Sequence, residues 1–190
     1  MIRLNFPNPV TDEKDFYGRK RREALEQAER NFRAEHSLSM VVVGERRVGK
    51  TSQLKVLLQR LEKLSAHRYV PLCIEPRGIT SLDDLALSIL QRLAVHSGRN
   101  LSEVGVSRKQ GFHLDTLGQF EQMFASLLGN VETGERFILC VDEFDEILRR
   151  VRSRSDAELL RLLGLMNLLT ERTTLPLVLL LSMRLVPHRE

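Results

Sequence analysis

The sequence predicts an α/β fold with a mostly parallel sheet and helices on both faces of that sheet. Four apolar, β-rich runs alternate along the chain with stretches of helical periodicity. The first run, residues 38–43, has no polar alternation, which is typical of a strand covered on both faces. A glycine-rich sequence follows this run directly, and open α/β sheets bind ligands at the carboxyl ends of their strands.

The composition is that of a soluble globular protein of about one domain. Of the 190 residues, 42% are hydrophobic and 28% are charged. The N-terminal residues lack the apolar core of a signal peptide, and the longest apolar stretch, around 177–181, is too short to cross a bilayer. We therefore expect a cytoplasmic protein with no membrane partner. Cys73 and Cys140 lie in apolar runs and are expected to be buried, reduced thiols.

The first half of the chain is expected to contain two helices and two strands. Residues 19–36 place apolar side chains at spacings of three and four among many charges, which predicts a helix with one packed face. The run 38–43 is the first strand, and leucines at helical spacing predict a helix from the glycine-rich sequence to about residue 65. Residues 69–74 form the second strand, whose Pro71 indicates a position at the edge of the sheet.

The second half is expected to contain three helices, two strands and one long loop. The helices repeat apolar residues every three or four positions, the strands are uninterrupted apolar runs, and the loop contains three glycines. In chain order, these segments are a helix at 82–95, a loop at 96–112, a helix at 116–128, a strand at 137–141, a helix at 156–172 and a strand at 175–181 that ends at Ser182.

Residues 44–51 match the phosphate-loop pattern G-x-x-x-x-G-K-[ST] in full, between a predicted strand and a predicted helix. The backbone N–H groups of such a loop surround the phosphates of a nucleotide. Lys50 would reach the β and γ phosphates, and the Thr51 hydroxyl would bind Mg²⁺. The side chains of Arg46 and Arg47 are expected to point outward, where a partner contact is possible. The expected nucleotide-binding residues of this segment are Gly44, Glu45, Arg46, Arg47, Val48, Gly49, Lys50, Thr51 and Ser52.

A second motif, Phe-Ile-Leu-Cys-Val-Asp-Glu at 137–143, is an apolar strand that ends in two acids. A carboxylate at this position can hold Mg²⁺ beside the phosphates, and we assign this role to Asp142. Glu143 is suited to act as the general base that deprotonates the attacking water. Many strands end in acids, so this motif indicates an Mg²⁺ site only in combination with the phosphate loop. Asp145 and Glu146 are interpreted as solvated acids or as acids at a helix N-terminus.

The phosphate loop, Asp142 and Ser182 each follow the carboxyl end of a predicted strand. Right-handed crossovers place these ends along one edge of a parallel sheet, so the three features are expected to converge. Ser182 then has two possible roles. Its hydroxyl could contact the γ phosphate or the lytic water as part of the catalytic machinery, or it could satisfy local backbone groups.

Three segments together resemble the AAA+/STAND branch of the P-loop ATPases, near the archaeal-type ATPases and the origin-recognition initiators. They are Phe-Tyr-Gly-Arg at 16–19 with Glu23 and Leu25, the phosphate loop, and Leu-Cys-Val-Asp-Glu-Phe-Asp-Glu-Ile at 139–147. The resemblance implies a three-layer α/β/α core with an extra strand between the strands that carry the two motifs. It also implies that Phe16, Tyr17, Gly18 and Arg19 help to cover the adenine base.

The resemblance also implies a division of the chain. Residues 1–37 would be a lead-in and a helix with the base-binding element, and residues 38–190 would be the ATPase core. Relatives of this type continue with a fifth strand and a small helical lid. The lid is absent here, so the chain is expected to be the N-terminal nucleotide-binding part of a longer protein, ending after the fourth strand.

The leading functional hypothesis is an ATP-binding, Mg²⁺-dependent ATPase that acts as a conformational or oligomerisation switch, with ATP or ADP bound and a homo-oligomer forming in the ATP state. One alternative is a nucleotide-gated assembly module with little hydrolysis. Another is a DNA-associated, initiator-like ATPase, suggested by a sequence pI near 9.4. The arginines at positions 149, 150, 152 and 154 could contact nucleic-acid phosphates, supply an arginine finger to a neighbouring subunit, or form a solvated helix end.

Overall fold

The computed structural model describes residues 19–33, 39–45, 47–63, 68–106, 112–129, 135–171 and 177–184. Within these ranges the chain forms six α-helices, four strands and a short 3-10 helix. In chain order the elements are α1 (Arg19–Arg33), β1 (Met40–Gly44), α2 (Lys50–Glu62), β2 (Arg68–Ile74), α3 (Leu82–Ser97), η2 (Leu101–Val104), α4 (Leu117–Leu128), β3 (Glu135–Val141), α5 (Phe144–Arg154), α6 (Asp156–Glu171) and β4 (Leu177–Arg184).

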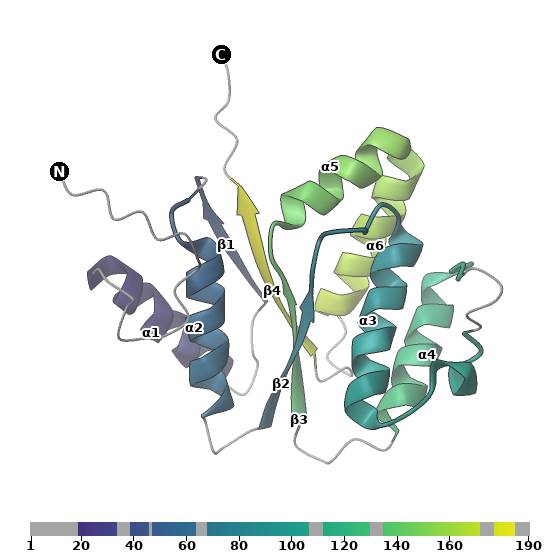
Figure 1. The fold of residues 1–190 in the computed structure, drawn as a ribbon, viewed down its shortest axis with the longest axis horizontal. Helices are drawn as coiled ribbons and strands as arrows, with labels where there is room; N and C mark the ends of the chain where they lie inside the picture. Colours follow the sequence, from purple (N-terminus) through teal and green to yellow (C-terminus); the bar gives the residue numbers. More distant parts are fainter. Residues whose placement is uncertain are drawn as a thin grey trace.

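The four strands form one parallel sheet in the order β1-β4-β3-β2, and Figure 1 shows them between two groups of helices. The predicted α/β fold with a parallel sheet is confirmed. β4 lies between β1 and β3, so one strand separates the strands that precede the two motifs, as the resemblance implied. β2 is at the end of the order, which confirms the edge position indicated by Pro71.

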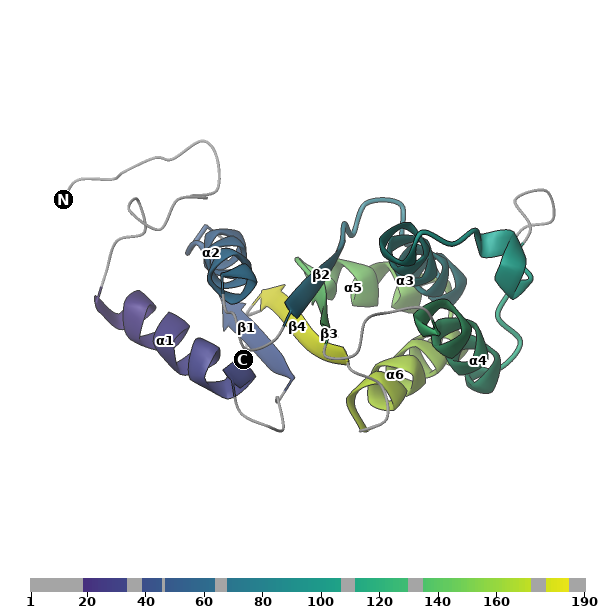
Figure 2. The ribbon, with the colours of Figure 1, turned by 90° about the horizontal axis from the view of Figure 1, so that it is seen from below.

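Helices cover both faces of the sheet because alternate strand residues bury apolar side chains on either side. α1 and α2 pack on one face around Leu54, Leu57 and Ile138. α3, α5 and α6 lie on the other face, where the larger core includes Phe137 and Leu139. α4 lies farther from the sheet, against α3 and α6 (Figure 2). None of the helices in the described ranges is long and apolar enough to cross a membrane.

The loop predicted at 96–112 is only partly present. α3 continues to Ser97 and ends at Gly98, whose φ of 66° lies in the left-handed region that suits glycine. Residues 101–104 then form η2, because Asn100 and Glu103 make a capping box at its start. Residues 107–111 of the predicted loop lie outside the described residues.

The prediction that the first strand is covered on both faces is wrong for β1. Val41 and Val43 are 51% and 53% exposed. The physical reason is topological: β1 ends the strand order, and α5 and α6 pack over β4 on that side of the sheet. The apolar run therefore reflects the β propensity of valine and the partial burial of one face, which carries Met40 and Val42.

Two further expectations need correction. Cys73 is exposed, because it lies on the edge strand β2, whereas Cys140 on the interior strand β3 is buried as expected. The fourth strand does not end at Ser182 but runs on to Arg184, in register with the end of β1.

Residues 144–154, to which periodicity assigned no element, form α5. The sequence of α5 is mostly charged, and its buried residues are Phe144, Ile147 and Val151, which form a narrow apolar stripe.

Candidate nucleotide-binding site

The phosphate loop leaves the carboxyl end of β1 in a conformation that requires glycine at two positions. A Cβ atom on Gly44 would lie 2.9 Å from the Cγ2 atom of Val48. Gly49 has a φ of 89°, in the left-handed region, and forms the N-cap of α2. Arg47 also has a positive φ, of 64°. Glu45, Arg47 and Val48 are exposed, as expected for outward-pointing loop side chains, while Arg46 lies outside the described residues.

Lys50 is folded back over the loop. Its Nζ atom donates to the carbonyl oxygens of Gly44 at 3.0 Å and Glu45 at 2.8 Å. The ammonium group is thereby held at the start of the loop and beside the N-terminus of α2, which begins at Lys50 itself. A positive charge held in this way is suited to bind an anion that enters the loop.

The N-terminus of α2 is also suited to bind an anion. α3 is capped by the Ser81 hydroxyl and has Asp83 and Asp84 in its first turn. α2, in contrast, has no side-chain cap and no acid in its first turn. Its helix dipole and N-terminal N–H groups therefore favour a negatively charged ligand, and a phosphate is the usual ligand at such a terminus.

Thr51 and Asp142 bring the two motifs together. The Thr51 hydroxyl in the first turn of α2 donates to the Asp142 carboxylate after β3 at 2.6 Å, across 91 residues of sequence. Hydroxyl and carboxylate oxygens are ligands that Mg²⁺ prefers, and both lie next to the phosphate loop. The residues present therefore fit an Mg²⁺ ion that would accompany a bound nucleotide.

Ser182, on the neighbouring strand β4, contacts both Asp142 and Glu143, the acidic pair that follows β3. Its side chain is fully buried, and its hydroxyl donates to the Asp142 carboxylate. The same hydroxyl accepts the Glu143 backbone N–H at 2.9 Å. The sequence left two roles open for Ser182: contact with the γ phosphate or the lytic water, or hydrogen bonding to local groups. These contacts support the second role. Its predicted convergence with the phosphate loop and Asp142 is present, because Asp142 contacts both Thr51 and Ser182.

Glu143 is exposed and occupies a strained position at the N-cap of α5. Its φ of 50° and ψ of 45° lie in the left-handed region. This conformation costs a non-glycine residue about 1–3 kcal/mol, and strain of this kind is common at functional sites. Two hydrogen bonds from its backbone N–H, to Ser182 and to the Asp142 carboxylate at 3.0 Å, fix the turn. The side chain is therefore presented to solvent directly beside the Asp142 carboxylate.

Arg184 is a site residue that the sequence analysis missed. It pairs in register with Gly44, the first residue of the phosphate loop, and its backbone N–H donates to Asp145 at 3.0 Å. Its guanidinium group lies 3.5 Å from the Glu146 carboxylate. An arginine two positions after Ser182 on the same strand was the available signal, but the strand was predicted to end too early.

Asp145 and Glu146 lie in the first turn of α5, as one of their two predicted roles required. A hydrogen bond from Arg149 lowers the pKa of Glu146 below its ordinary value of 4.5, against the opposing effect of burial. The charges of Arg149, Arg184 and Arg150 lower this pKa further. Glu146 therefore stays ionised and links β4 to α5.

The arginines of α5 have different surroundings. Arg150 donates to the Pro76 carbonyl oxygen at 2.6 Å, which ties α5 to the segment after β2. Arg149, Arg152 and Arg154 are exposed. The residues predicted to cover the base, Phe16, Tyr17 and Gly18, lie outside the described residues, and Arg19 begins α1.

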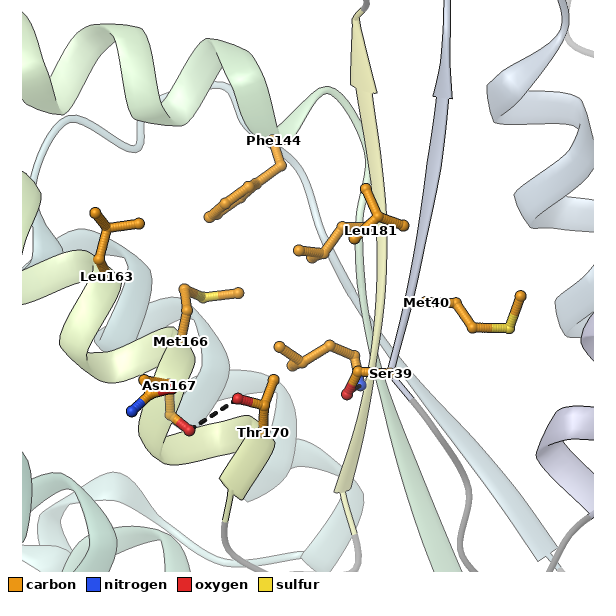
Figure 3. A pocket seen from close by; sticks show the side chains of 10 residues that line it. Ser39, Met40, Phe144, Leu163, Met166, Asn167, Thr170 and Leu181 are labelled. Carbon is orange, nitrogen blue, oxygen red and sulfur yellow. Dashed lines mark hydrogen bonds between the residues drawn. The ribbon is translucent and has the colours of Figure 1, made fainter.

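An apolar hollow of about 240 Å³ lies on the other side of β1 and β4 from α2, below α5 and beside α6 (Figure 3). Phe144, Leu163, Met166 and Leu181 line it, and Met40 points away toward α2 (Figure 3). None of its lining residues belongs to the phosphate loop or to the acidic pair. The hollow is therefore separate from the nucleotide site.

The fold and the site together define a P-loop nucleotide-binding domain: a parallel α/β sheet, a phosphate loop between β1 and α2, and an acid after β3 that contacts this loop. A family model described as an AAA domain matches residues 33–186, and the chain belongs to this family. Family membership indicates a nucleotide-binding ATPase domain. A search of curated proteins found no match to this sequence.

Proposed function

We propose that this domain binds ATP with Mg²⁺ at the phosphate loop and hydrolyses the nucleotide, acting as a conformational switch of the AAA+/STAND type. The observation that carries the proposal is the chain of hydrogen bonds from Thr51 through Asp142 to Ser182. These hydrogen bonds join Thr51 at the start of α2 to Asp142 directly after β3 and to Ser182 within β4. Residues from three separate segments thus converge where the phosphates would lie.

Each residue of this chain has a specific task in the proposed reaction. The loop N–H groups and Lys50 bind the phosphates, while Thr51 and Asp142 hold Mg²⁺, which offsets phosphate charge when bound. Glu143 orients the attacking water and takes up its proton. Ser182 positions Asp142 and the Glu143 turn. The segment with Phe16, Tyr17, Gly18 and Arg19 is proposed to cover the base.

Contacts between β4 and α5 support the switch. Asp145 and Glu146 in the first turn of α5 contact Arg184 at the end of β4, in register with Gly44. Binding or loss of a nucleotide at the phosphate loop would therefore act on α5 through two contacts of Arg184: its backbone hydrogen bond to Asp145 and its ion pair with Glu146. α5 is the element that we propose to move.

The test of hydrolysis is Glu143→Gln, which keeps the size of the side chain and removes the base. We expect ATP binding, measured by calorimetry, to persist while phosphate release falls by about 10²–10⁴-fold. Glu26→Gln, a change at an exposed glutamate of α1, is the matched control and should leave turnover intact. Unchanged turnover in Glu143→Gln would remove Glu143 from its proposed role.

A second candidate is a module whose ATP-dependent assembly occurs with little hydrolysis. The observation that favours it is the exposure of Val41 and Val43 on β1, whose one sheet neighbour among the described residues is β4. An apolar strand at a sheet edge is a common site of pairing with another chain, here a second copy. Light scattering with and without ATP, run beside a phosphate-release assay, separates the candidates: assembly without release favours the second.

A nucleic-acid partner is a third candidate, favoured by the exposed Arg149, Arg152 and Arg154 on α5. Binding to phosphates should weaken steeply as salt concentration rises. Fluorescence anisotropy with a labelled DNA duplex at low and at moderate salt tests this. Absence of binding at low salt would dismiss DNA as a partner of this domain.

A further inference from the structure

The two cysteines of the chain lie side by side on neighbouring strands. Cys73 on β2 is the register partner of Cys140 on β3. Paired residues of parallel strands are about 4.8 Å apart, within the range of Cα separations that a disulfide can span. Register partners also point to the same face of the sheet, and Cys140 belongs to the core cluster under α1 and α2.

The two thiols differ in their access to solvent. Cys73 is exposed at the edge strand, whereas Cys140 is buried behind it. Because the two residues are register partners on one face of the sheet, their side chains are neighbours. An oxidant from solvent would therefore meet Cys73 first, with Cys140 held within reach of it.

The surroundings of Cys73 favour its thiolate form. The hydrogen bond from Cys140 is the largest effect, and Arg92 of α3 and Lys55 of α2 add positive charge, while burial and Glu62 of α2 oppose them. Together they lower the pKa of Cys73 from 9.0 to about 7. Because the thiolate is the reactive form of cysteine, Cys73 has the character of a thiol that peroxides attack.

We propose that Cys73 and Cys140 form a reversible redox-modification site at which a hydroperoxide oxidises Cys73 and Cys140 then closes an intramolecular disulfide. With hydrogen peroxide, the oxidant of the test, the Cys73 sulfur first attacks one peroxide oxygen, the O–O bond breaks, and the other oxygen takes up a proton and leaves as water; an organic hydroperoxide would release an alcohol instead. In the second step the Cys140 sulfur attacks the resulting sulfenic acid, the S–O bond breaks, and a second water leaves with the Cys140 proton. The two thiols lose two electrons, which reduce one peroxide.

The cysteine pair does not take part in the proposed nucleotide binding, but it lies near the proposed nucleotide site. Cys140 is two residues before Asp142 on the same strand. The disulfide would join β2 to β3 at positions that are already paired, so that the register of the two strands is retained.

The experiment uses the full chain, reduced and then treated with hydrogen peroxide. Because the sequence contains two cysteines, an intramolecular disulfide has one possible connectivity. We expect intact-mass spectrometry to show a monomer that has lost the mass of two hydrogen atoms, and a peptide map to link Cys73 to Cys140. Dithiothreitol should restore the original mass. A covalent dimer, or over-oxidised Cys73 beside a free Cys140 thiol, would overturn the proposal.

Two variants separate the roles of the thiols. In Cys140→Ala the sulfenic acid of Cys73 should accumulate and be trapped by dimedone. In Cys73→Ser, a change at an exposed position, the Cys140 thiol should resist peroxide under the same conditions. Equal oxidation of Cys140 with and without Cys73 would contradict the proposed order of attack. If Cys140→Ala fails to fold, Cys73→Ser and the peptide map of the natural chain still decide the question.

Discussion

Replacing Ser182 with alanine tests whether a buried hydroxyl holds the acidic pair in place. Ser182 is fully buried and donates to the Asp142 carboxylate. A hydrogen bond to a charged group contributes about 1.5–3 kcal/mol. The backbone N–H of Glu143 also loses its 2.9 Å contact with Ser182 but keeps the Asp142 carboxylate at 3.0 Å. We therefore expect the free energy of unfolding to fall by about 2 kcal/mol.

Urea denaturation followed by circular dichroism measures this change, provided that the slope of the transition stays constant. For a chain of this size, a loss of about 2 kcal/mol corresponds to a fall in melting temperature of roughly 4–8 °C. Ser153→Ala is the matched control, since Ser153 is an exposed serine whose hydroxyl donates to the Arg150 carbonyl oxygen at 2.7 Å. The control should stay within about 0.5 kcal/mol of the natural chain. Equal losses in the two variants would show that the buried Ser182 hydroxyl contributes no more to stability than an exposed one.

Substitutions at Glu146, Glu143 and Val43 test three other features of the domain. Glu146→Gln should destabilise the domain at neutral pH, because Arg149 and its neighbours hold the Glu146 pKa below 4.5. The stabilisation that the ionised Glu146 carboxylate contributes is fully present above pH 4.5 and is lost as the pH falls through the lowered pKa. A difference in urea midpoint between variant and natural chain that widens on acidification would contradict this. Glu143→Gly should relieve left-handed strain and raise the free energy of unfolding by about 1 kcal/mol while phosphate release falls; a less stable variant would show that the strain is absent. Val43→Lys, at a position 53% exposed, should leave monomer stability within about 0.5 kcal/mol and abolish any ATP-dependent assembly measured by light scattering; persistent assembly would place the interface elsewhere.

The sheet and the centre of the site were predictable because they depend on local patterns and on one topological rule. The loop pattern at 44–51 carries its own backbone requirements, which Gly44 and Gly49 meet in the structure. The rule that parallel strands share a carboxyl edge then brought Asp142 and Ser182 together. Neither inference needed side-chain packing.

The remaining features depend on which elements become neighbours, which periodicity does not reveal. Val41 and Cys73 lie in apolar runs like those of interior strands, yet both are exposed because β1 and β2 end the strand order. Arg184 became a site residue only through its register with Gly44 and its contact with α5. The division at residue 37 and the base-binding role of residues 16–19 stay predictions.

Calorimetry of ATP binding with and without Mg²⁺ measures whether Thr51 and Asp142 hold a divalent cation for a bound nucleotide, as we propose. We predict that Mg²⁺ tightens ATP binding to the natural chain by about tenfold or more, equivalent to about 1.4 kcal/mol. Asp142→Asn should lose this Mg²⁺ dependence, whereas Asp115→Asn, at an exposed aspartate, should retain it. ATP affinity that is the same with and without Mg²⁺ in the natural chain, or an undiminished Mg²⁺ effect in a folded Asp142→Asn variant, would contradict the claim.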